Sequence, residues 1–401
     1  MSRRTPEGDT VGFVGYPADS ILIPPMVHLR LPLGLVASVL LVLLAGGCYE
    51  NDTSSAAPPD FSAAVLPSDD ALTRRIDELL EFTRDNRRLN SRDHAAWQVV
   101  HGVLAFGGEF QIEHEGLLVP ALDWLLSGQG RLRGWNVRAG GANDKGPIAV
   151  LEPGSKEGQG HPDQWLGYLS QTGLGLDEEI VAGGHSYTIR DLLEQAKWDI
   201  YEGMEATWTL MAFSVYMPLE AEWENKRGEK WNVERVVAME AGQLGPPEPG
   251  QFSVGDSACG GSHRLFGLAV MLNKYLAETG NSPDELKGGW KLANMKLQDA
   301  KRIARQFQQP DGTFSAHYFN RAGTTANVSE RIGTTGHTFE MLATTMSQQE
   351  IREPWMRKAA DQLCTLLEQT REIELDVGGL YHACHGLFVY RQRLANASLE
   401  Q

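Results

Sequence analysis

The chain has 401 residues, with 36 lysines and arginines against 52 aspartates and glutamates, which gives a net charge of −16. An acidic chain without basic clusters is a poor partner for nucleic acid or for anionic lipid, so neither is expected as a ligand. The four cysteines stand at positions 48, 259, 364 and 384, and no Cys-x-x-Cys spacing occurs. This spacing excludes zinc-finger and thioredoxin-like motifs.

A lipoprotein signal peptide is predicted near the N-terminus. Arg30 precedes an apolar run, Leu31–Leu44, that is shorter than a typical membrane span, and Ala45-Gly46-Gly47 leads into Cys48. This pattern predicts cleavage before Cys48 and lipidation of its thiol. An uncleaved anchor helix and cleavage by ordinary signal peptidase are the alternatives.

The same features divide the chain into four predicted segments. Residues 1–25 are interpreted as a start-site artefact, because Met26 begins a normal signal n-region. Residues 26–47 form the signal peptide, 48–66 a flexible Pro/Ala/Ser-rich tether, and 67–401 a single helical domain. The expected location is outside the cytoplasm, lipid-anchored to the cell envelope. The outer membrane facing the periplasm is preferred because no aspartate follows the lipidated cysteine.

Helical periodicity dominates the domain. Six segments are amphipathic: 70–87, 163–169, 189–200, 231–241, 290–307 and 351–367. Five others are almost wholly apolar: 94–106, 206–216, 263–275, 337–346 and 382–390. A helix that is apolar all round is buried, whereas one with a single apolar stripe faces water on its other side. The alternation predicts an all-α fold of about five to six helical hairpins, with an inner ring of buried helices inside an outer ring.

Few other elements are expected. Strand signals are limited to short pieces such as 147–151, and long insertions occur at 128–160, 219–261 and 316–333. Insertions of this length inside a domain are usually functional or disordered, so they are expected to lie over one mouth of the ring.

Three motifs carry a resemblance to a known superfamily. Gln308-Gln309-Pro310-Asp311-Gly312-Thr313-Phe314 resembles the Gln-x-x-Asp-Gly-Ser-Trp/Phe turn of terpenoid cyclases and protein prenyltransferases, whose fold is an α/α toroid. Tyr381-His382-Ala383-Cys384 is similar to the Tyr-His-Thr-Cys that begins an inner helix in prenyltransferase β-subunits. Asp256-Ser257-Ala258-Cys259 is similar to their Asp-x-Cys zinc-ligand pair, with one extra residue. The resemblance implies an α/α toroid over about residues 160–395.

The resemblance does not extend to the chemistry of that superfamily. The acid clusters Asp-x-Asp-Asp and Asp-Asp-x-x-Asp of the cyclases are missing from this sequence. Prenyl diphosphates and their protein acceptors are cytosolic, whereas this domain is expected to be exported. The whole chain also resembles a family of exported planctomycete lipoproteins. Some of these carry a label of GTPase activation directed at ADP-ribosylation factors, but the zinc-finger cysteines and arginine arrangement of such activators are missing here.

Histidines supply most of the candidate chemistry. Several stand at the predicted first turn of an inner helix, where the helix dipole disfavours imidazolium and keeps the ring available as a base or ligand. If the inner helices run parallel around a ring, these histidines converge on one mouth. The candidate catalytic residues are His94, His101, His161, Asp163, His263 and His337.

A zinc site is the sharpest hypothesis, because zinc takes ligands from His, Cys and Asp. The candidate ligands are Asp256, Cys259, His382 and His385. The alternative interpretation is that the histidines cap or hydrogen-bond the inner helices, and that Cys259 and Cys384 are small core residues.

Two classes of function remain open. The first is an envelope-anchored domain that binds a small molecule, a glycan or an envelope protein in its central cavity. The second is an enzyme, either a polysaccharide lyase or hydrolase or a zinc-dependent enzyme, that uses His and Asp groups at the mouth of the toroid. A pocket with convergent titratable groups would favour the enzyme.

Overall fold

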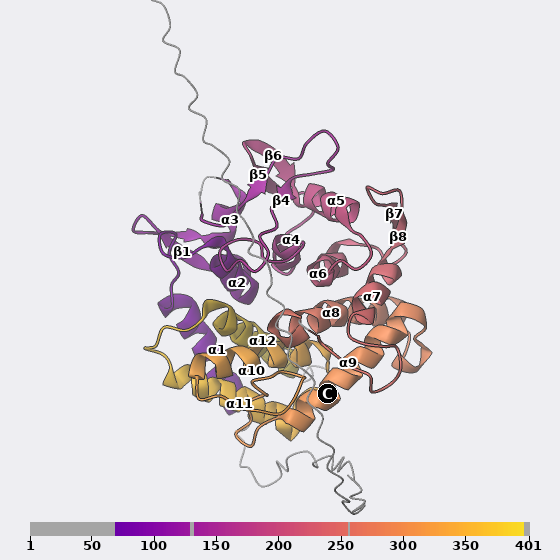
Figure 1. Ribbon diagram of the computed structural model, residues 1–401. Coiled ribbons are helices and arrows are strands. Elements are labelled where there is room, and N and C mark those ends of the chain that lie inside the picture. The colour runs from indigo at the N-terminus through magenta and orange to yellow at the C-terminus, as the bar shows by residue number, and fades with distance from the viewer. Residues whose placement is uncertain (1–68, 129–131, 256, 397–401) are drawn as a thin grey trace, which may run out of the picture. The chain divides into compact units, whose positions relative to one another are not determined.

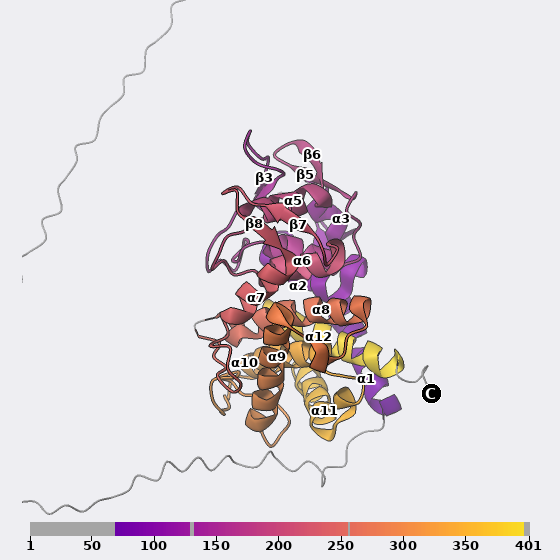
Figure 2. The ribbon, with the colours of Figure 1, turned by 90° about the vertical axis from the view of Figure 1, so that its right-hand side faces the viewer.

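The computed structural model describes residues 69–128, 132–255 and 257–396, which are built mainly from α-helix (Figures 1 and 2). The mostly helical architecture predicted from the sequence is confirmed for this part of the chain. None of the described helices combines the length and the apolar character needed to cross a membrane. The predicted signal peptide, the tether with its lipidated Cys48, and Asp256 lie outside the described residues.

The described part of the chain contains twelve α-helices. They are α1 (Asp69–Asn86), α2 (Ala96–Phe106), α3 (Ala121–Leu126), α4 (Gln164–Ser170), α5 (Ile189–Asp199), α6 (Thr207–Tyr216), α7 (Val233–Gly242), α8 (Ser262–Thr279), α9 (Gly288–Phe307), α10 (Val328–Thr345), α11 (Pro354–Gln369) and α12 (Val377–Asn396).

Eight short strands form four separate antiparallel pairs within these residues. They are β1 (Gln111–His114) with β2 (Leu117–Pro120), β3 (Val137–Arg138) with β4 (Ile148–Ala149), β5 (Glu179–Ala182) with β6 (His185–Thr188), and β7 (Glu222–Glu224) with β8 (Lys230–Asn232). Only β4 had a predicted strand signal. The other pairs are too short to show the alternation that marks a strand in a sequence.

The even-numbered helices pack against one another in cyclic order. Helix α2 contacts α4, α4 contacts α6, α6 contacts α8, α8 contacts α10, α10 contacts α12, and α12 returns to α2. Helices α1, α5, α9 and α11 lie farther from the centre in Figure 1, and each packs on one or two helices of this cycle. The α10–α12 contact is the most extensive of all.

Glycines allow the helices of the cycle to approach closely. A Cβ atom built on Gly336 of α10 would lie 2.8 Å from the Cα, Cβ and backbone nitrogen of Ala383 in α12. Gly167 of α4 faces Trp208 of α6 in the same way, at 2.7 to 2.9 Å. Interiors this tightly packed have no room for an extra methyl group, so these positions fix how near the helices come.

Two inner helices begin earlier than predicted. Helix α10 starts nine residues before His337, because Asn327 caps it by accepting hydrogen bonds from the backbone N–H groups of Ser329 and Glu330. Helix α12 starts five residues before His382. The expectation that His337 and His382 occupy the first turn is therefore wrong, and the helix-terminus argument for their neutral state does not apply to them.

The segment at 163–169 also differs from its prediction. It was expected to be an amphipathic outer helix, but all seven residues of α4 are buried and the helix belongs to the inner cycle. Its polar members find partners locally: Gln164 accepts a hydrogen bond from the Gly160 backbone at 3.0 Å, and Ser170 donates to the Gly167 carbonyl at 2.6 Å. Polar groups whose hydrogen bonds are satisfied can be buried at little cost, so the polar residues of this segment did not indicate a solvent-exposed face.

The α10–α12 contact predicts opposite outcomes for two neighbouring glycines. Gly336→Ala should destabilise the fold by about 1–3 kcal/mol, because the new methyl overlaps the backbone of Ala383. Gly333→Ala on the same helix meets nothing nearer than 3.6 Å and gains helix propensity, so its stability should change by less than about 1 kcal/mol. Urea unfolding of both variants measures this. Equal free energies of unfolding for the two variants would show that the Gly336–Ala383 contact does not limit how closely α10 and α12 pack.

Candidate functional site

Four imidazole rings meet inside the helix cycle, each from a different helix. His382 of α12 is the common neighbour, with its ring centroid 4.0 Å from that of His337 (α10), 5.0 Å from His263 (α8) and 5.1 Å from His101 (α2). Tyr168 of α4 packs on both His101 and His382. We call the five residues His101, Tyr168, His263, His337 and His382 the histidine cluster.

Cys259 reaches this cluster through an unusual turn. Cys259, Gly260 and Gly261 all have positive φ, at 48°, 59° and 81°, and α8 starts directly after them. A side chain at Gly260 would collide with the Tyr318 ring at 2.2 Å, so the turn lies flat against that ring. A non-glycine residue in the left-handed region is strained, and such strain is often retained at functional sites.

The hydrogen bonds of Glu340 fix how the rings are protonated. Its carboxylate contacts Nδ1 of His382 at 2.8 Å and Nδ1 of His385 at 2.5 Å. A carboxylate only accepts, so both Nδ1 atoms carry the proton and His382 has a lone pair on Nε2. That lone pair lies 3.3 Å from Nε2 of His263, which must therefore be the donor. Nδ1 of His263 is left with a lone pair.

Three potential metal ligands, Cys259, His263 and His337, lie close together beside this hydrogen-bond network. Nδ1 of His263 is buried and has no hydrogen-bond partner among the described residues. Nδ1 of His337 donates to the Gly333 carbonyl at 2.7 Å, so Nε2 is the nitrogen that would bind a metal ion once the ring has lost its second proton. One nitrogen of each ring and the Cys259 sulfur lie within 4.8 Å of one another. A thiol and two imidazole rings therefore lie close enough to share one metal ion.

The electrostatics of the cluster depend on one buried negative charge. Burial alone would raise the pKa of the Glu340 carboxyl, but its contacts with His382 and His385 outweigh burial and hold that pKa far below its usual value. Burial lowers the pKa of His263 and His382, with further lowering from the neighbouring rings. Burial also opposes charge on His337, but the Cys259 sulfur, the Gly333 carbonyl and Glu340 together outweigh burial and raise the His337 pKa to about 9.

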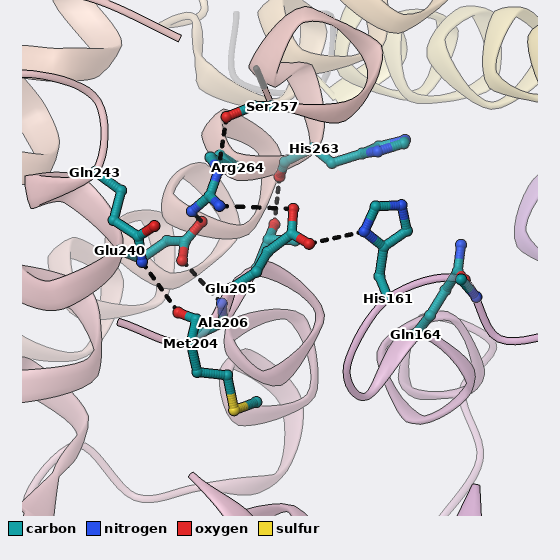
Figure 3. A network of polar contacts seen from close by, with 12 residues as sticks. His161, Gln164, Met204, Glu205, Ala206, Glu240, Gln243, Ser257, His263 and Arg264 are labelled. Atoms are coloured by element: carbon teal, nitrogen blue, oxygen red, sulfur yellow. Dashed lines mark hydrogen bonds and ion pairs between the residues drawn. The ribbon is translucent and has the colours of Figure 1, made fainter. Parts of the chain in front are cut away.

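A pocket of about 470 Å³ opens beside Cys259, and Figure 3 shows the polar network along its wall. His161 contacts Glu205 through Nδ1 at 2.7 Å. The ring of His161 stacks on the Trp208 indole at 4.4 Å, and the same indole contacts His263 at 5.2 Å. His161 and the histidine cluster are therefore separated by one aromatic side chain.

Arg264 links three residues on the other side of this pocket. It donates to Ser257 at 2.9 Å and to the fully buried Glu240 at 2.8 Å, and it lies 3.8 Å from Glu205. Burial raises the pKa of Glu240 to about 7, although Arg264 opposes this shift. Thr207 donates to the His263 carbonyl, so the start of α8 is tied to α6.

The predicted site residues divide into two groups. His101, Cys259, His263, His337 and His382 come together in or beside the cluster, and His161 lines the adjoining pocket. The others do not meet them directly. His94 lies before α2 and accepts a hydrogen bond from the Asn90 backbone, Asp163 accepts one from Thr209, and His385 contacts the far oxygen of Glu340.

Glu340 and Arg264 were not among the predicted site residues. A signal for Glu340 was present, because it follows His337 by three residues and therefore shares its helical face. Nothing comparable marks Arg264, whose partners Glu240 and Glu205 come from a different helix and from the loop before α6.

No family model, curated protein or solved structure matches this chain.

The environment of Asp163 predicts a pH-dependent stability. Burial raises the pKa of its carboxyl to about 6, so the fold favours the protonated form. Its contribution is fully present below about pH 4 and is lost as the pH rises through 6. Asp163→Asn should therefore stabilise the protein above pH 6, by at most about 3 kcal/mol, and have little effect below pH 4.

The geometry suits this substitution, because asparagine tolerates the positive φ of 56° at this position and can still accept from Thr209. Thermal unfolding at pH 4, 6 and 8 measures the effect, with Asp70→Asn at an exposed position of α1 as the control. A pH-independent effect of Asp163→Asn would contradict the raised pKa of the Asp163 carboxyl.

Proposed function

We propose that this chain is a metal-dependent hydrolase whose metal ion, zinc by the chemistry of the donors, binds to Cys259, His263 and His337. The observation that carries the proposal is the convergence of one thiol and two imidazole rings, one of which has a buried nitrogen without a partner. A buried polar atom without a hydrogen bond is costly, and a bound cation would satisfy it.

The donor set fits zinc. Cysteine sulfur and histidine nitrogen are its usual protein ligands, and three protein ligands leave a position free, as in catalytic zinc sites. His382 would act as an outer partner of His263, and Glu340 would orient His382 in turn. Such second-layer carboxylate and imidazole contacts fix the ring orientation of metal ligands.

The adjoining pocket supplies the groups that hydrolysis needs. A bound zinc ion polarises a substrate oxygen and activates water. His161 carries its proton on Nδ1 when that atom donates to Glu205, so its Nε2 is available to accept a proton from water and return it to a leaving group. Arg264 is neutralised by Glu240 and Glu205, so the pocket does not favour a strongly anionic substrate.

Two finer expectations from the sequence belong to the same proposal. The cyclic order of helix contacts supports an α/α toroid, and a polysaccharide or another neutral substrate suits the pocket beside the cluster. Export and a lipid anchor at Cys48 would place this activity at the cell envelope. A purely ligand-binding function would use the same pocket. It becomes the preferred interpretation if the purified protein shows no hydrolytic activity.

A second candidate uses Cys259 as a nucleophile. The backbone at Cys259 is strained, and its sulfur lies within 4.8 Å of a His337 ring nitrogen, so the two form a thiol–imidazole pair of the kind found in acyl-transfer enzymes. Cys259 is half-buried, whereas Cys364 and Cys384 are buried and provide internal controls. In this case iodoacetamide should modify Cys259 much faster than the other two, and the purified protein should hold no metal.

The metal proposal predicts the composition of the purified full-length protein. We expect about one zinc ion per chain, lost from Cys259→Ser and His337→Ala and retained in His185→Ala, whose histidine is exposed. His382→Ala should weaken zinc binding by about 10- to 100-fold without abolishing it. Zinc retained in both ligand variants would rule out this site, and a folded protein without metal would leave the nucleophile as the candidate.

Cobalt substitution adds a signature that folding alone cannot produce. In the cobalt-loaded protein, a thiolate–cobalt charge-transfer band should be present in wild type and in His185→Ala and absent from Cys259→Ser. Circular dichroism of each variant separates loss of metal from loss of fold.

The proposed general base predicts a loss of rate without a loss of metal. His161→Ala should lower kcat for 4-nitrophenyl acetate hydrolysis by about 100-fold or more, since general base catalysis typically contributes that much. Glu205→Gln should have a smaller effect and displace the pH profile, because it alters only the partner of His161. Zinc content should stay unchanged in both. An unchanged kcat in His161→Ala would remove this residue from the mechanism.

A further inference from the structure

A second pocket, of about 570 Å³, lies on the side of Glu340 that His385 occupies. Its walls come from α1, α2 and α12, together with residues that follow α4, and it shares no lining residue with the pocket beside Cys259. The volume is in the range of small-molecule sites, and nothing in the proposed function uses it.

The floor of this pocket presents a hydrogen-bond acceptor. His385 is 8% exposed, and its Nδ1–H is held by Glu340 at 2.5 Å. The remaining nitrogen, Nε2, therefore carries a lone pair. A ligand that reaches the floor must bring a donor, such as an amine or a hydroxyl group.

The walls combine an apolar surface with one unpaired negative charge. Leu80, Leu104, Phe106 and Phe388 line the pocket, and Phe388 is 38% exposed, which is unusual for a phenylalanine. Four of the five charged lining residues form ion pairs: Arg84 with Glu109 and with Asp85 outside the pocket, and Arg391 with Asp77. The fifth, Glu81, has no ion-pair partner among the described residues.

We propose that this pocket binds a small amphiphilic amine. The apolar part of the ligand would cover Phe388 and its aliphatic neighbours, while the ammonium group would face Glu81 and donate toward His385. Three carboxylates against two guanidinium groups in the lining favour a cation over an anion. The proposal goes beyond the hydrolytic function and does not depend on it, because the two pockets are separate.

Three probes with one apolar body test the charge preference: 4-phenylbutylamine, 4-phenylbutan-1-ol and 4-phenylbutyrate. Isothermal titration of full-length protein, in excess EDTA so that the metal centre plays no part, should show the amine binding at least about tenfold more tightly than the carboxylate. The alcohol should lie between them. Equal affinities, or no binding of the amine at millimolar concentration, would overturn the proposal.

Two surface substitutions locate the site without threatening the fold. Phe388→Ala should weaken all three probes by about tenfold or more, because it removes the exposed apolar wall. Glu81→Gln should weaken only the amine, by about three- to tenfold, as expected for one partly solvated ion pair. The matched controls are Glu78→Gln on α1 and Val215→Ala, which is 46% exposed on α6. Effects of equal size in the controls would place binding elsewhere.

Discussion

The histidine cluster depends on one buried charge, the Glu340 carboxylate. Removing a carboxylate from water costs several kcal/mol unless hydrogen bonds replace the lost solvent. Glu340 obtains those bonds from His382 and His385, both on the neighbouring helix α12. Glu340 therefore lies in the most extensive helix contact of the described fold and also sets the protonation of the cluster.

That charge also explains why the rings of His382 and His263 each have a defined tautomer. Because Glu340 accepts from His382 Nδ1, Nε2 of His382 must accept from His263, and the free lone pair of His263 is then on Nδ1. Each bond removes one choice of tautomer from the next ring. A packed aromatic core would hold the rings in place, but it would not decide which nitrogen is available as a ligand.

Close helix approach is the second constraint, and it is what brings these groups together. Gly386 of α12 lies against the backbone of Glu340, where an added Cβ would be 3.0 Å away. Gly267 of α8 lies against Thr207, one helical turn after His263, whose carbonyl accepts a hydrogen bond from Thr207. Without these glycines the helices would stand farther apart, and the bonds of 2.5 to 3.3 Å across the cluster could not form.

The sequence by itself determined the helical class, most helix positions and the types of residue in the cluster. Apolar periodicity is a local property, so segments such as 189–200 and 290–307 were placed within two residues of α5 and α9. Cys259 and His382 were also recognised as candidates from their residue types and local motifs.

Only the tertiary structure decided which of these residues meet. Cys259 and His337 are 78 positions apart in the sequence, and no local pattern records their contact. The burial of α4 was likewise decided by the helices α2 and α6 that pack against it. Long-range contacts select among locally acceptable structures, which is why residue types were predictable from the sequence and their geometry was not.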